Sequence, residues 1–135
     1  VRGAVRRRFV RTGGVDPSVD LHVMATGSDD RLLRASIETG AHGLVIEGTG
    51  AGNVPPAAVP AIRDALKAGI PVVIASRCGA GSVAPLYGYE GGGAQLHKLG
   101  CILGSDLVGQ KARVLLMVAL GAGLSDLALR ALFEA

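Results

Sequence analysis

The sequence of 135 residues lacks tryptophan, has only 3% aromatic residues, and contains two cysteines. With so few aromatic side chains there is little on which nucleic-acid bases could stack, so a nucleic-acid-binding surface has little support. Cys78 and Cys101 show neither metal-ligand spacing nor a secretory context, which argues against a zinc site or a disulfide and predicts two reduced thiols. No apolar run approaches the roughly 20 residues that a membrane-spanning helix needs.

The charge of the chain is concentrated at its start. The net charge is +3, and five of the fourteen basic residues fall within the first eleven positions: Arg2, Arg6, Arg7, Arg8 and Arg11. Charged residues stand where a signal peptide would need an apolar block, and the chain opens without methionine. These features predict that residues 1–19 are a solvated connector from a missing amino-terminal domain. With the free thiols, they also predict a cytoplasmic protein that binds neither nucleic acid nor membrane.

Short apolar runs alternate with helical patterns along the rest of the chain. A composition of 49% hydrophobic and 19% charged residues suits one compact domain. A strand-helix-strand-helix-strand order requires right-handed crossovers, so the strands are expected to be parallel. The sequence therefore predicts a three-layer α/β domain over residues 20–135, with a roughly four-stranded parallel sheet and helices on both faces.

The predicted elements follow from these patterns. Strands are expected at 20–25, 43–48, 71–76 and 101–103, and helices at 31–40, 56–68, 92–99, from about 110 and from 125. Polar residues at 28–30 are expected to cap the first helix, and the last one is expected to pack through Leu127, Leu129, Leu132 and Phe133.

A glycine-rich turn follows the second predicted strand and ends at Asn53. Gly48, Gly50 and Gly52 allow backbone angles closed to other residues, and ligands gather at the carboxyl edge of such sheets. Asn53 could therefore contact a small polar molecule, or it could instead cap a helix that begins a few residues later. The dinucleotide pattern G-x-G-x-x-G fails, because Asn53 occupies the position of its third glycine.

Other candidate groups are isolated in the sequence. The three histidines, His22, His42 and His97, have no common spacing and are expected to be structural. Arg77, at the end of the third strand, could be functional or could neutralise nearby carbonyl ends. Glu90 ends a long, irregular loop and has no acid, histidine or lysine near it in sequence, so no acid–base pair is apparent. It could equally keep the loop soluble.

Three segments, at 47–55, 71–77 and 104–120, resemble the carboxyl-terminal domain of the bacterial-type L-asparaginases. They read Glu-Gly-Thr-Gly-Ala-Gly-Asn-Val-Pro, Pro-Val-Val-Ile-Ala-Ser-Arg and Gly-Ser-Asp-Leu-Val-Gly-Gln-Lys-Ala-Arg-Val-Leu-Leu-Met-Val-Ala-Leu. They have the order and spacing of the family, and the similarity extends from about residue 20 to the end. The sequence departs from the family at Ala51, where asparagine is usual, and at Val108 and Gly109, where the family has Asn-Pro.

The resemblance implies a two-domain amidohydrolase that converts L-asparagine to L-aspartate and ammonia without a cofactor or metal. The threonine nucleophile of the family lies in an amino-terminal domain, so this chain is expected to hold no catalytic residue and to be inactive alone. In the family this domain completes the substrate site of a neighbouring subunit in a homodimer or tetramer. Asn53 matches the asparagine that reaches the substrate, and Glu90 is the candidate for a glutamate that some members contribute.

Two alternatives remain open at this point. The chain could be a non-catalytic module that binds a small metabolite or mediates dimerisation through the same sheet edge. Amidase subunits that act on misacylated tRNA share the family fold and form a nearby enzyme alternative.

Overall fold

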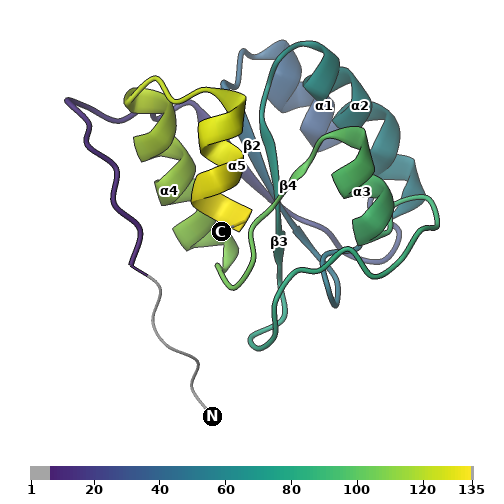
Figure 1. The fold of residues 1–135 in the computed structure, drawn as a ribbon. Helices are drawn as coiled ribbons and strands as arrows, with labels where there is room; N and C mark the ends of the chain where they lie inside the picture. Colours follow the sequence, from purple (N-terminus) through teal and green to yellow (C-terminus); the bar gives the residue numbers. More distant parts are fainter. Residues whose placement is uncertain (1–6, 135) are drawn as a thin grey trace.

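The computed structural model describes residues 7–134 as a four-stranded parallel sheet between two layers of helices (Figure 1). The strands lie in the order in which they occur in the chain, and every neighbouring pair is parallel. They are β1 (Val19–Val23), β2 (Gly43–Gly48), β3 (Val72–Ser76) and β4 (Ile102–Leu103). The predicted α/β architecture is confirmed.

Each helix between strands crosses the same face of the sheet. Each new strand is added on the same side of the previous one, so right-handed crossovers bring these helices together on one face. The helices that follow β4 cover the other face (Figure 1). The first layer holds α1 (Arg31–Glu38), the short 3-10 turn η1 (Pro56–Ala58), α2 (Val59–Lys67) and α3 (Gly93–Leu99), and the second holds α4 (Gly109–Gly121) and α5 (Asp126–Glu134).

The core consists of two apolar layers, one on each face of the sheet. All six residues of β2 are buried, because the strand is central and covered on both sides. Leu44 and Ile46 belong to the cluster beneath α1, α2 and α3, whereas Val45 belongs to the cluster beneath α4 and α5. The alternation of side chains along the strand therefore divides one continuous apolar run between two cores.

Three local features differ from the sequence-based expectations. Of the polar residues expected to cap α1, Asp29 accepts the backbone N–H of Arg31 at 3.2 Å, whereas the carboxylate of Asp30 makes no cap and pairs with Arg34 at 2.8 Å. Leu127 is 79% exposed, although Leu129 and Phe133 of the same helix are buried as expected. The loop after β3 is mostly exposed, yet Val83 in its middle is buried against Gly52. These residues lie at helix starts or in irregular backbone, where tertiary contacts decide what a side chain meets.

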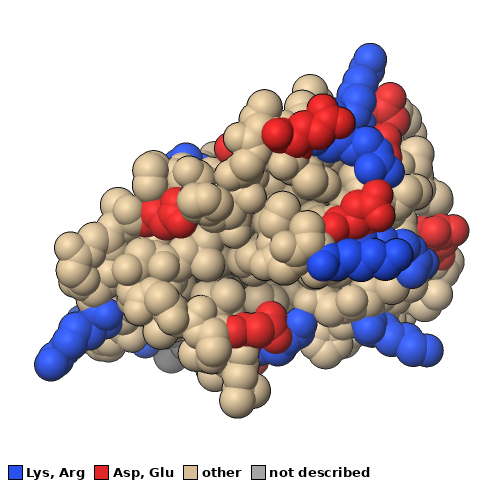
Figure 2. Space-filling view, turned by 90° about the horizontal axis from the view of Figure 1, so that it is seen from above, with Lys and Arg blue, Asp and Glu red and all other residues tan. Residues whose placement is uncertain are grey.

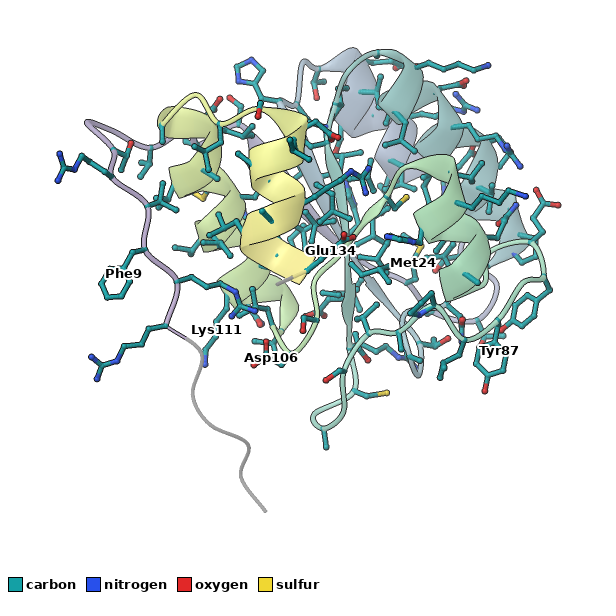
Figure 3. The ribbon with its side chains drawn as sticks, in the orientation of Figure 1. Phe9, Met24, Tyr87, Asp106, Lys111 and Glu134 are labelled. Carbon is teal, nitrogen blue, oxygen red and sulfur yellow. The ribbon has the colours of Figure 1, made fainter. Side chains whose placement is uncertain are left out.

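The segment before β1 runs along α4 (Figure 1). The Nε atom of Arg8 donates to the carbonyl oxygen of Leu132 at 3.1 Å, and its Nη2 atom forms an ion pair with Asp106 at 3.0 Å. Phe9 points outward from this segment and is 85% exposed (Figure 3). The division into a connector at 1–19 and a domain at 20–135 stays a prediction, and Arg2 and Arg6 lie outside the described residues.

Within residues 7–134 no helix has the length and apolar character required to cross a membrane. Seen from above, onto the edge where the strands begin, basic and acidic side chains are intermixed on the surface rather than gathered by sign (Figure 2).

Candidate functional site

The glycine turn after β2 is a tight loop whose geometry excludes larger residues. The backbone N–H groups of Thr49 and Asn53 each donate to the other residue's carbonyl oxygen, at 2.8 and 2.9 Å. A Cβ atom on Gly48 would lie 2.5 Å from the carbonyl oxygen of Asn53. Gly52 has a φ of +103°, and a Cβ atom there would lie 2.7 Å from Val83. The glycines therefore fix Asn53 at the carboxyl edge of the sheet.

Asn53 is half-buried, and only one of the two polar groups of its side-chain amide forms a hydrogen bond within the described residues. Its Oδ1 atom accepts a hydrogen bond from the backbone N–H of Gly93, the first residue of α3, at 3.3 Å. Asn53 thus contacts α3, and not the 3-10 turn that begins at Pro56 and leads into α2. The Nδ2 group has no hydrogen-bond partner among residues 7–134. The amide is therefore oriented by its oxygen and keeps its donor available.

Ser76 and Arg77 connect the ends of three strands beside this turn. The hydroxyl of Ser76 donates to the carbonyl oxygen of Gly50 at 2.5 Å. The backbone N–H of Arg77 donates to the carbonyl of Gly48 at 2.9 Å, and its Nη1 atom donates to the carbonyl of Met24 at 3.2 Å. The guanidinium of Arg77 thus neutralises the carbonyl group that follows β1, which is the structural alternative foreseen for it.

A hollow of about 300 Å³ opens next to Asn53, between the segments that follow β1 and β2. Two threonines, an asparagine, a tyrosine and two prolines contribute to its wall, and no charged residue among those described lines it. The uncharged wall suits a small ligand or part of one, because such sites combine apolar surface with a few polar groups. Lining residues include Thr26, Thr49, Asn53, Pro55, Pro56 and Tyr89.

Glu90 lies on the same side of the sheet but is exposed and is not part of this wall. The loop end that carries it is joined to the glycine turn, because the N–H of Val54 donates to the carbonyl oxygen of Gly91 at 2.8 Å. The structure therefore brings the backbone of Asn53 and Glu90 into one region, while the residue of this loop that lines the hollow is Tyr89. Sequence reasoning did not single out Tyr89.

A buried carboxylate, Glu47, was also missed. Its side chain is 8% exposed, and its Oε1 atom accepts the backbone N–H of Gly109 at 2.7 Å. Gly109 is the first residue of α4, so the carboxylate meets the positive end of the helix dipole. A charged residue within the apolar run of β2 is the signal that could have revealed it, since such a group needs a partner when buried.

The three histidines are held in separate ion-pair or hydrogen-bond contacts. His22 lies 2.8 Å from the hydroxyl of Ser36, and burial lowers the pKa of His22. His42 Nδ1 lies 2.7 Å from Asp16, whose pKa is lowered by the backbone N–H of Ser18 and by this histidine. His97 lies 3.3 Å from a carboxylate of α5. Across the described chain, no three His, Cys, Asp or Glu side chains form a potential metal site.

Comparison with known proteins relates the sequence and fold to one group of enzymes. Residues 18–133 match the family model of the glutaminase/asparaginase C-terminal domain. The L-asparaginase of Bacillus licheniformis is 38% identical over 104 residues, which cover 77% of this chain and 32% of that protein. A glutamyl-tRNA(Gln) amidotransferase subunit from Methanosarcina mazei is 37% identical over 108 residues, 80% of this chain and 25% of that protein.

A solved structure agrees with these sequence relatives. The crystal structure of a probable cytoplasmic L-asparaginase from Campylobacter jejuni matches with a TM-score of 0.75 and 34% identity, over 87% of this chain and 34% of that chain. The present chain thus spans about a third or less of the length of the proteins it matches.

Proposed function

Because this chain belongs to the glutaminase/asparaginase C-terminal domain family, we propose that it is the carboxyl-terminal domain of an L-asparaginase-like amidohydrolase. The full protein would convert L-asparagine to L-aspartate and ammonia as a cytoplasmic homodimer or homotetramer. This domain would complete the substrate site of a neighbouring subunit and would be inactive alone.

The observation that carries the proposal is the state of the Asn53 amide. Its oxygen is fixed by the N–H of Gly93, and its Nδ2 donor faces no partner within residues 7–134. A donor that is oriented in advance can bind an acceptor on a substrate with little loss of conformational entropy. Its place at the carboxyl edge of the sheet, beside an uncharged hollow, supports contact with a small polar molecule.

In this mechanism the domain positions the substrate and the amino-terminal domain supplies the nucleophile. A threonine hydroxyl would attack the side-chain amide carbon of asparagine, ammonia would leave, and water would hydrolyse the resulting acyl-enzyme. Asn53 would hold the substrate in the orientation that this attack requires. Glu90, exposed on the adjoining loop, would add a negative charge at the rim of the same site.

A second candidate function follows from the similarity to amidotransferase subunits: a part in a glutamyl-tRNA(Gln) amidotransferase. Similarity to a glutamyl-tRNA(Gln) amidotransferase subunit covers slightly more of this chain than similarity to an L-asparaginase, at nearly the same identity. A protein of that kind would also release ammonia from an amide, but the ammonia would be used to amidate an aminoacyl-tRNA. The two are separated by asking whether free L-asparagine alone is turned over.

We would test the proposal with a chimera in which this whole chain replaces the matching carboxyl-terminal region of the Bacillus licheniformis L-asparaginase. The chimera is expected to release ammonia from L-asparagine, and the isolated 135-residue chain is expected to release none. Asn53→Ala should reduce kcat/KM by about tenfold or more, since an oriented hydrogen bond to the substrate is lost.

Gln110→Ala serves as the matched control, because Gln110 is an exposed amide on α4 outside the Asn53 hollow. Ammonia release by the isolated chain would contradict the proposal. So would a folded chimera that assembles into oligomers but leaves L-asparagine intact.

A further inference from the structure

The wall of the hollow beside Asn53 contains one aromatic ring, that of Tyr89. Tyr89 is 55% exposed, so part of this residue is available to a ligand. It shares the hollow with polar groups of a different kind, namely the Thr26 and Thr49 side chains and the Asn53 amide. A flat apolar surface together with a small set of hydrogen-bonding groups is the usual composition of a site for a small polar molecule.

Tyr89 is held in place by contacts on its own loop. Its ring contacts that of Tyr87, with centroids 5.6 Å apart and planes inclined by 37°. Its carbonyl oxygen accepts the N–H of Gly92 at 2.8 Å. Figure 3 shows Tyr87 on the outside of the molecule, on the loop that leads into α3.

The backbone that follows Tyr89 is packed against the turn that carries Asn53. Gly91 has a φ of +89°, and a Cβ atom there would overlap the carbonyl oxygen of Val54. The carbonyl oxygen of Gly91 accepts the N–H of Val54 at 2.8 Å, and Asn53 itself bonds to Gly93. Tyr89 and Asn53 are therefore placed relative to one another by direct backbone contact between their segments, although they are far apart in the sequence.

We infer that Tyr89 is a substrate-contacting residue of the site that Asn53 anchors. The inference rests on the proposed function and extends it. The substrate's hydrogen-bonding group faces the Asn53 amide, and its methylene carbons lie against the phenol ring. Glu90 and Tyr89 then have different roles, because Tyr89 lines the hollow and Glu90 does not.

The kinetic test uses the chimera that contains the whole chain, with L-asparagine as substrate. Tyr89→Ala is expected to raise KM about tenfold with a much smaller effect on kcat, as expected for loss of an apolar contact present before and during reaction. Tyr89→Phe keeps the ring and is expected to keep KM within about twofold of the parent value. Leu86→Ala is the matched control, because Leu86 is 66% exposed on the same loop and does not line the hollow.

A KM for Tyr89→Ala equal to that of Leu86→Ala would overturn the inference while leaving the proposed function intact. An inactive parent chimera would count against the proposed function instead, and a binding measurement on the isolated chain then decides the role of Tyr89.

That measurement exploits the absence of tryptophan and the presence of only two tyrosines, both on this loop. In the Tyr87→Phe chain all tyrosine fluorescence comes from Tyr89. Titration with L-asparagine to about 50 mM, enough to detect millimolar binding, is expected to change this emission. The change should be lost in a chain that also carries Asn53→Ala. An emission that does not respond to L-asparagine would refute a ligand contact at Tyr89.

Discussion

Replacement of Glu47 should measure how strongly a buried carboxylate stabilises the start of α4. Glu47→Ala removes a charge-assisted hydrogen bond to the N–H of Gly109, made at 2.7 Å by a residue only 8% exposed. Such bonds contribute about 1.5–3 kcal/mol, and a negative charge at a helix N-terminus adds about 0.3–1 kcal/mol. The expected loss in the free energy of unfolding is therefore about 2–4 kcal/mol.

Glu47→Gln should cost less, about 1 kcal/mol, because the amide oxygen can still accept the hydrogen bond while the charge is gone. Urea denaturation at constant temperature, followed by far-ultraviolet circular dichroism, measures both changes. With a slope of about 2 kcal/mol per molar urea, Glu47→Ala should lower the unfolding midpoint by about 1–2 M. Glu38→Ala is the control, because Glu38 is an exposed carboxylate at the end of α1.

The same contact predicts non-additivity. A Cβ atom on Gly109 would overlap the Oε1 atom of Glu47, so Gly109→Ala alone should be strongly destabilising. In a chain that already carries Glu47→Ala the obstructing atom is absent, and the second substitution should cost much less. Equal midpoints for Glu47→Ala and Glu38→Ala, or additive effects of the two substitutions at 47 and 109, would refute this account of the helix start.

Three further outcomes are expected from the described contacts. Cys78 is exposed, whereas burial raises the pKa of the Cys101 thiol to about 12. A thiol reagent should therefore modify one cysteine in the native chain and both in denaturant. Rapid modification of both cysteines in the native chain would contradict this. Gly91→Ala should lower the melting temperature more than Gly27→Ala. Both glycines have a positive φ, but of the two only Gly91 lies where an added Cβ atom would meet backbone atoms. Thermal unfolding that gave the lower melting temperature for Gly27→Ala would be inconsistent with that geometry. Burial lowers the pKa of His22 below its ordinary 6.5, so the unfolded chain binds more protons than the folded chain near that pH. The stability of the fold should therefore fall as the pH drops below about 6.5. A titration of the His22 ring by NMR that gave a pKa above 6.5 would exclude this effect.

The strands were the most predictable part of the fold. The sequence places β2 at residues 43–48, and the structure has the same limits, because a continuous apolar run between glycines is typical of a strand buried on both faces. The start of the second predicted helix was less accurate: residues 56–58 form a 3-10 turn before α2 begins at Val59. Local patterns specify that a helix forms but determine its first turn poorly, since that turn depends on caps and tertiary contacts.

The candidate site was only half predictable. Asn53 could be singled out because it follows a glycine turn at the end of a strand. The predictions for Asn53 and Glu90 as substrate contacts stay predictions, and the structure adds Tyr89, which faces the hollow. Nothing in the local sequence distinguishes Tyr89 from the nearby Tyr87. The two differ in their tertiary contacts, because Tyr89 lines the hollow beside the turn after β2.

The sequence by itself determined the parallel α/β architecture, the buried central strand and the edge at which Asn53 stands, since periodicity and glycine placement act over a few residues. Only the tertiary structure decided which distant groups meet there. Asn53 bonds to a residue 40 positions away, and Glu47 bonds to one 62 positions away. Those pairs form because right-handed crossovers bring the ends of parallel strands and the starts of later helices to one edge, and no local pattern encodes that distance.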